Sequence, residues 1–230
     1  MTATRLAAAQ RILVIGAEAA GKTTLARRLA AARGIACVHL DEIAWQSARA
    51  PERDLSGQFE PGYTSSEPLV VRPLADRLAA IDEIAARPDW VAEGVFLTWT
   101  EALFAAADVI VWLDHVPLFT ALRRVLGRHV RSIRRNVRAL RGRPLGENAR
   151  TIASGARRLA GTLRRIVRFH VSRRSTLPDP DDYRGITRRA MRSAASAHRE
   201  KVLHVGSSAD LARLTRSQRS EPSSRPRALR

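Results

Sequence analysis

A stretch near the start of the chain has the residue types and spacing of a phosphate-binding loop. Gly16 and Gly21 enclose four residues and are followed by Lys22 and Thr23, which matches the pattern Gly, four residues, Gly-Lys-Thr. Glycines let the backbone turn tightly, so that successive N–H groups can converge on phosphate oxygens. We expect the whole loop to bind nucleotide phosphates, through Gly16, Ala17, Glu18, Ala19, Ala20, Gly21, Lys22, Thr23 and Thr24.

Two side chains of this loop have roles that follow from their chemistry. Lys22, one of only two lysines in the chain, would reach the terminal phosphates of the nucleotide. The hydroxyl of Thr23 would hold a Mg²⁺ ion that keeps most of its waters. The expected cofactors are therefore ATP and Mg²⁺.

Three acids follow apolar segments that are expected to be strands. Asp41 follows the segment 35–40, Glu93 follows 90–92 and Asp114 follows 109–113. In a parallel α/β sheet, ligands bind at the carboxyl ends of the strands. Asp41 is a candidate for binding the acceptor substrate, for deprotonating its hydroxyl or for holding a magnesium water. Glu93 and Asp114 are alternative metal candidates, and each of the three acids could instead cap a helix.

The elements that would position these residues alternate between strands and helices. Apolar runs predict strands over 12–15, 35–40, 90–92, 109–113 and 202–205. Helical spacing and end signals predict helices over 25–33, 68–87, 98–107 and 183–199, and further helices that begin at 117 and near 208. The segment 45–67 is too long for an ordinary connection and predicts a substrate-covering loop or a flexible insertion. The pattern predicts an α/β fold of three layers around a five-stranded parallel sheet.

The positive charge is concentrated in the second half of the chain. The net charge is +18, of which residues 1–115 carry −4 and the remainder +22. From Arg128 to Arg174 there are 15 arginines and a single acid, Glu147. Such a surface could contact the phosphates of a nucleotide, a nucleic acid or an anionic membrane, although an arginine-favouring composition would also produce it. Apolar residues at helical spacing predict a helical hairpin in this region, at Leu159, Leu163, Ile166 and Val167.

Composition also bounds the compartment of the protein. No run approaches the roughly 20 apolar residues of a membrane span, and residues 1–10 lack the apolar segment of a secretory signal. The single cysteine, Cys37, stands in an apolar segment and predicts a buried thiol. These features predict a cytoplasmic protein.

The order of these segments resembles the nucleoside monophosphate kinase group. Five strands alternate with helices, a phosphate loop follows the first strand, and an arginine-rich insertion separates the fourth strand from the fifth. The closer resemblance is to adenylate-kinase-like proteins, often labelled topology modulation proteins or small AAA-family ATPases. It extends over residues 10–215 and is carried by the segments 39–41, 90–94, 107–114 and 124–128.

The resemblance implies further roles and boundaries. In adenylate kinases an Arg-x-x-x-Arg pair at the start of the lid contacts the transferring phosphates, and this pattern falls on Arg124 and Arg128. The acid-glycine pair after the third strand is usually Asp-Gly, whereas this chain has Glu93 at that acid. The implied organisation is one P-loop kinase-like domain over 10–215, with a helical lid over 124–175 and a disordered tail over 216–230.

Together these features predict a Mg-ATP-dependent kinase of a small-molecule acceptor, either a nucleotide or another small metabolite. The expected catalytic residues are Lys22, Asp41, Arg124 and Arg128. An alternative is a nucleic-acid-associated ATPase whose arginine-rich half binds the phosphate backbone without sequence specificity. A third reading is a chain that only binds nucleotide.

Overall fold

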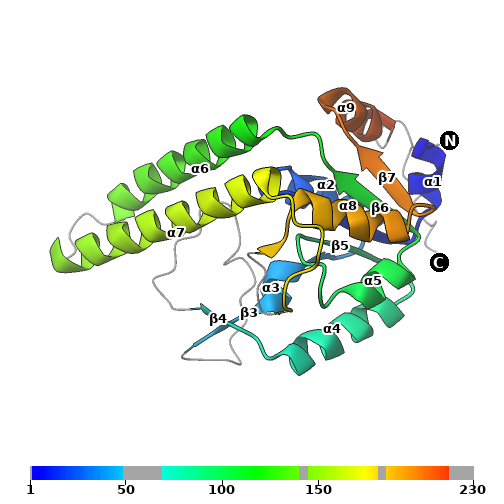
Figure 1. The fold of residues 1–230 in the computed structure, drawn as a ribbon, viewed down its shortest axis with the longest axis horizontal. Helices are drawn as coiled ribbons and strands as arrows, with labels where there is room; N and C mark the ends of the chain where they lie inside the picture. Colours follow the sequence, from blue (N-terminus) through cyan, green and yellow to red (C-terminus); the bar gives the residue numbers. More distant parts are fainter. Residues whose placement is uncertain (1, 49–68, 140–144, 181–184, 218–230) are drawn as a thin grey trace, which may run out of the picture.

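The protein is built around one parallel sheet. The computed structural model describes residues 2–48, 69–139, 145–180 and 185–217. Five strands lie in the order β2-β5-β1-β6-β7, and every neighbouring pair is parallel. Their bounds are Arg11–Gly16 (β1), Cys37–His39 (β2), Trp90–Gly94 (β5), Val109–Leu113 (β6) and Val202–Val205 (β7). The predicted α/β class and five-stranded parallel sheet are confirmed, with helices on both faces that are compatible with three layers (Figure 1).

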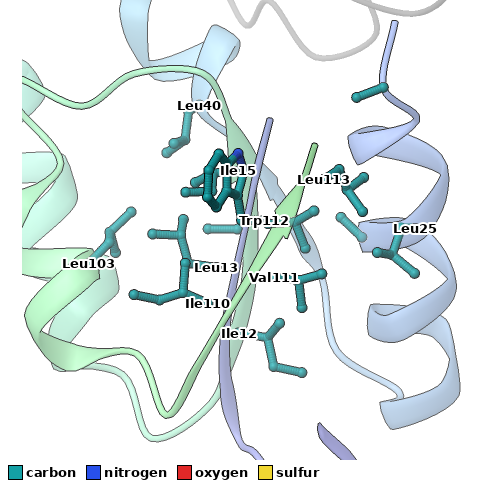
Figure 2. Close-up of a cluster of buried hydrophobic side chains, with 14 of the residues drawn as sticks. Ile12, Leu13, Ile15, Leu25, Leu40, Leu103, Ile110, Val111, Trp112 and Leu113 are labelled. Atoms are coloured by element: carbon teal, nitrogen blue, oxygen red, sulfur yellow. The ribbon is translucent and has the colours of Figure 1, made fainter. Parts of the chain in front are cut away.

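The two faces of the sheet are covered by different helices. Leu113 lies on the side of Leu25 in α2 (Lys22–Arg33), whereas Ile110 lies on the side of Leu103 in α5 (Glu101–Ala106; Figure 2). This follows from the two-residue period of a strand, and burial of both faces explains why the central strands read as continuous apolar runs. The register pairs Ile15 with Gly94 and Gly16 with Leu113, so the carboxyl ends of β1, β5 and β6 meet at one edge.

The N-terminal helix α1 (Thr2–Ala8) was not predicted. Leu6 is fully buried in the core, and the guanidinium of Arg33, at the end of α2, donates to the carbonyl oxygen of Leu6 over 2.6 Å. An alanine-rich segment of seven residues shows little hydrophobic periodicity, which is why the sequence did not predict the helix. A helix this short depends on its tertiary contacts for stability. The predicted end of α2 at Arg33 is confirmed. Gly34, which follows it, adopts the left-handed conformation (φ 69°) of a helix C-cap.

The predicted helix over 68–87 is wrong in its first part. Residues Leu69–Val71 form β4, which pairs antiparallel with β3 (Trp45–Ser47), and helix α4 begins only at Leu74 and ends at Ala86. The β-branched Val70 and Val71 favour a strand, and Pro73 disfavours helical backbone at the residue before it. Within the segment predicted as a loop, residues 45–47 are therefore a strand, and residues 49–68 lie outside the described residues.

Three other boundaries differ from the prediction. Helix α3 (Leu40–Ala44) begins inside the segment predicted as the second strand, and α5 begins at Glu101 rather than at 98. Helix α8 (Arg188–Ala197) begins five residues after the predicted start at 183, which lies outside the described residues. Its start is fixed by the hydroxyl of Thr187, which accepts a hydrogen bond from the backbone N–H of Ala190 over 3.0 Å.

The arginine-rich region forms the predicted helical hairpin. Helices α6 (Leu118–Ala139) and α7 (Leu145–Val171) lie side by side and extend away from the sheet (Figure 1). Near the sheet, Val125, Ile166 and Phe169 are buried in the core. The last helix, α9 (Ser208–Ser217), includes the first two residues of the predicted disordered tail, and residues 218–230 lie outside the described part of the chain.

Candidate phosphate-binding site

The glycine-rich loop lies at the carboxyl end of β1, where the strand order of the sheet reverses. Successive strands are added on the β5 side of β1 and then on its β6 side, and ligands of open α/β sheets bind outside such a switch point. Gly16 is required there because a Cβ atom would lie 2.6 Å from the carbonyl oxygen of Leu113. Gly21 has φ 94°, and Ala19 adopts φ 62°, which is strained for a residue with a side chain.

Lys22 and Thr23 occupy the first turn of α2, directly after the loop. The ammonium of Lys22 donates to the carbonyl oxygen of Ala17 over 3.0 Å, so it folds back across the loop. The hydroxyl of Thr23 donates to Oε1 of Glu93 over 2.9 Å. Glu93, on β5, is therefore the acid that contacts the predicted metal-binding threonine. Thr24 is exposed on α2.

A chain of hydrogen bonds behind Glu93 holds its carboxylate in place. Nδ1 of His39 lies 3.0 Å from Oε1 of Glu93, and Arg27 donates to Nε2 of His39 over 3.3 Å. Because Nε2 accepts from Arg27, Nδ1 is the donor to Glu93. Burial opposes ionisation of Glu93, but hydrogen bonds from His39 and Thr23 together with the charge of Lys22 hold its pKa below its usual range. Glu93 is therefore an anion at neutral pH.

Asp41 lies in the first turn of α3, beside the same charged groups. Its position is within the helix rather than at the N-cap, which is His39. The side chain is partly buried, and burial, reinforced by the charge of Glu93, raises its pKa to about 6, while the charge of Lys22 opposes this rise. The pKa of Asp41 is therefore well above that of an ordinary aspartate, in a range that would suit a carboxylate that accepts a proton.

The hairpin delivers arginines to the loop from both of its helices. Arg124 on α6 donates to the carbonyl oxygen of Ala19 over 3.0 Å. Arg165 on α7 donates to the carboxylate of Glu18 over 2.5 Å. Arg128, the second arginine of the predicted pair, is exposed on α6 and interacts electrostatically with Glu18. The loop therefore lies beneath the base of the hairpin.

The structure places Asp114 in a different cluster. Its carboxylate, only 4% exposed, accepts two hydrogen bonds from Arg188 on α8, at 2.6 and 2.9 Å, and lies 3.2 Å from Nε2 of His204 on β7. No hydrogen bond between Asp114 and the loop is present among the described residues. Of the two acids proposed for the metal, Glu93 therefore accepts a hydrogen bond from Thr23, whereas Asp114 forms an ion pair with Arg188.

Two residues of the site were missed in the sequence. His39 carried a weak signal, because it lies two residues before the strand-end acid Asp41. Arg165 carried none, because its contact with Glu18 depends on how α7 folds back over the loop. A local pattern such as Arg-x-x-x-Arg cannot report a contact of this kind.

The donor set fits Mg²⁺ better than a metal held by the protein alone. The described residues contain no group of three or more His, Cys, Asp or Glu side chains that could hold a metal ion. A hydroxyl beside one carboxylate suits a Mg²⁺ ion, which usually keeps several waters and also binds phosphate oxygens. Thr23 and Glu93 could hold such an ion at the loop.

Two comparisons with known proteins found no relative of this chain. No family model matches the chain, and a search of curated proteins found no match. Within the described ranges, no helix is both long enough and apolar enough to cross a membrane.

Proposed function

We propose that this protein is a P-loop phosphotransferase that uses Mg-ATP to phosphorylate a small-molecule acceptor, either a nucleotide or another small metabolite. The observation that carries the proposal is the convergence of four elements on one glycine-rich loop. Lys22 comes from α2, Glu93 from β5, Arg124 from α6 and Arg165 from α7. The motif and its position at the switch point of the sheet support the same assignment.

This set of groups suits phosphoryl transfer. That reaction needs little covalent participation by the protein and depends on positioning and on neutralising charge at the transferring group. Lys22 would exchange its hydrogen bond with Ala17 for one with a terminal phosphate. Arg124 and Arg165 would add positive charge beside the loop. Closure of the hairpin base over the site would exclude water and limit hydrolysis.

The acid pair would divide the remaining tasks. Asp41, with its pKa near 6, would orient the acceptor hydroxyl and accept its proton at neutral pH. Thr23 would hold the Mg²⁺ ion and Glu93 would orient its waters, while His39 fixes the direction of the Glu93 carboxylate. The ion, when bound, supplies charge neutralisation at the phosphate oxygens.

The proposal is tested by ATP consumption in the presence of Mg²⁺, measured against a panel of nucleoside monophosphates, small alcohols and small acids. Each stimulating compound is then examined for a phosphorylated product by mass spectrometry. We expect one chemical class to stimulate turnover and to accumulate as its phosphate ester or anhydride. ATP binding without turnover on any acceptor would instead support a protein that only binds nucleotide.

A nucleic-acid-associated ATPase is the second candidate, favoured by the exposed arginines of the hairpin. Phe169 is the only Phe, Tyr or Trp between positions 128 and 174, and it is buried, so this arginine-rich stretch offers none of these rings for stacking on bases. Binding would therefore be limited to phosphate contacts and would weaken steeply with added salt. Stimulation of ATP hydrolysis by duplex DNA, with no effect of small acceptors, would favour this candidate.

A further inference from the structure

The hairpin exposes large apolar side chains on the side that faces away from the phosphate loop. On α6 these are Phe119, which is 79% exposed, with Leu126, Val130 and Ile133. At about 100° per residue, the four fall within an arc of about 60° on the helix. Their centre lies about 150° from Arg124, which reaches the loop. The apolar arc is therefore on the back of α6 as seen from the nucleotide site.

Helix α7 contributes to the same side. Val167 is exposed and lies about 160° around the helix from Arg165, which bonds to Glu18 of the loop. Since Arg124 and Arg165 both point at the loop, Val167 and the α6 arc both point away from it. We call this surface the back face and define it as Phe119, Leu126, Val130, Ile133 and Val167.

Arginines border the back face and acids are scarce near it. Arg123 lies about 50° from the centre of the α6 arc, and Arg164 about 60° from Val167, and both are exposed. Helices α6 and α7 together contain 13 arginines and one acid, Glu147. Long arginine side chains can extend beside an apolar surface and keep their charged ends in a polar layer. The back face therefore combines an apolar centre with a basic border.

An apolar centre with a basic border favours some binding partners of the back face over others. A second copy of the hairpin would bring arginines against arginines, which like-charge repulsion disfavours. A nucleic acid would use the arginines but would leave Phe119, Leu126 and Val130 in contact with a polar backbone. An anionic bilayer offers phosphate groups to the arginines and acyl chains to the apolar arc, as it does for interfacial amphipathic helices.

We propose that the back face of the α6–α7 hairpin binds the surface of anionic membranes, with the helices lying in the plane of the headgroups. Because the back face points away from Arg124 and Arg165, this contact leaves the phosphate loop directed toward the solvent side. The two helices of the hairpin extend away from the sheet (Figure 1). None of the back-face residues belongs to the proposed nucleotide site.

The test is co-sedimentation of the full chain with vesicles, without nucleotide. We expect binding to phosphatidylcholine vesicles that contain about 30% phosphatidylglycerol, and little binding to pure phosphatidylcholine. The double variant L126D/V130D should weaken this binding at least about tenfold, because it places charge in the apolar arc. The matched control L78D changes an equally exposed leucine on α4 and should bind like the wild type.

A second pair of variants tests the basic border. R123E/R164E should also weaken binding at least about tenfold, whereas R28E/R189E makes the same charge change on α2 and α8 and should have a small effect. Circular dichroism and thermal melting check that each variant is folded. An environment-sensitive NBD label on V130C, in a C37S background, should brighten on anionic vesicles, and the same label on L78C should not.

Four results would overturn the proposal. The first is that the wild type does not bind vesicles, and the second is that L126D/V130D leaves vesicle binding unchanged. The third is that the label at position 130 stays in water. The fourth is that the chain self-associates with rising concentration, that L126D/V130D abolishes this self-association, and that vesicles have no effect on it. Preference for duplex DNA over vesicles, with the apolar variants unaffected, would assign the surface to nucleic acid.

The variant K22A separates this proposal from the proposed function, since it should lose turnover and keep vesicle binding.

Discussion

The phosphate loop and the hairpin above it use charged side chains in opposite ways. At the loop, the two carboxylates have partners within the site. Thr23 and His39 form hydrogen bonds with Glu93, and Arg165 forms an ion pair with Glu18. On the hairpin, arginines at the base reach the loop, whereas those farther along the helices, such as Arg157, are exposed. Under the proposed function, the base of the hairpin would serve the nucleotide, which leaves its outer surface for the membrane contact proposed above.

The largest expected effect is at Lys22. K22A should lower turnover about 100- to 1,000-fold, because it removes a preorganised charge from the transferring phosphate. Its folding should change little, because the ammonium makes one hydrogen bond, to Ala17, at a partly exposed position. The matched control is K201A, at the only other lysine, whose ammonium bonds to the carbonyl oxygen of Ala105 far from the loop. Equal losses in the two variants would contradict the assignment.

The next effect is at Asp41, where activity and stability should change in opposite directions. D41N should lower turnover about 100-fold or more and remove the part of the pH–rate profile that rises through about pH 6. The raised pKa means that the native state binds a proton more tightly than the unfolded state, so stability falls as pH rises from about 4 to 6.

The same substitution therefore has a stability readout. At pH 7, D41N should raise the free energy of unfolding by at most about 3 kcal/mol, and partial exposure of the side chain reduces this gain. At pH 3.5 the gain should nearly vanish, because the carboxyl is then mostly protonated in both states. Urea unfolding at the two pH values measures the difference, and equal gains at both would show that Asp41 is not the titrating group.

A smaller effect separates the base of the hairpin from its outer surface. R124A and R165A should each lower turnover about 10- to 100-fold, because each removes one positive charge from the loop. R157A, an exposed arginine farther along α7, should leave turnover within about twofold. Steady-state kinetics with saturating ATP would decide this, and a loss in R157A as large as in R165A would contradict the division of the hairpin.

The smallest effect distinguishes the two acids proposed for the metal. E93Q should raise the Mg²⁺ concentration needed for half-maximal activity several-fold, because the carboxylate beside Thr23 is lost. D114N should leave this concentration unchanged and lower the free energy of unfolding by about 1–3 kcal/mol, because it weakens the buried end of the Arg188 pair. Mg²⁺ titrations and urea unfolding of both variants supply the two readouts, and a Mg²⁺ shift in D114N would reverse the assignment.

The sequence predicted what is local and missed what depends on distant contacts. The phosphate loop, the sheet strands and the end of α2 follow from short patterns, because their causes lie within a few residues. Asp114 looked equivalent to Glu93 in the sequence, since both end apolar strands. They differ because Arg188, from a helix far along the chain, engages Asp114, while Thr23 and His39 engage Glu93.

The errors in the fold have a similar origin. The spacing of apolar residues predicts helix at Leu69–Val71, but the conformation of this segment is set by its pairing with Trp45–Ser47 across a long segment. Helix α1 has little intrinsic signal and is held by Arg33 and by burial of Leu6. Arg165 reaches the loop only because α7 returns beside α6, and no spacing in the sequence encodes that approach.

The attachment of the hairpin gives it the mechanics of a lever. Val116 precedes α6, and Nε2 of His170, near the end of α7, lies 3.1 Å from the carbonyl oxygen of Val116. The two ends of the hairpin are therefore tied together beside the sheet, where Val125, Ile166 and Phe169 are buried. Helix α6 has 22 residues and is about 33 Å long. A rotation of about 10° at this pivot would move the tip by about 6 Å, while Arg124, less than two turns from the start of α6, would move by only about 2 Å. Force applied at the far end would thus reach the phosphate loop with a several-fold mechanical advantage.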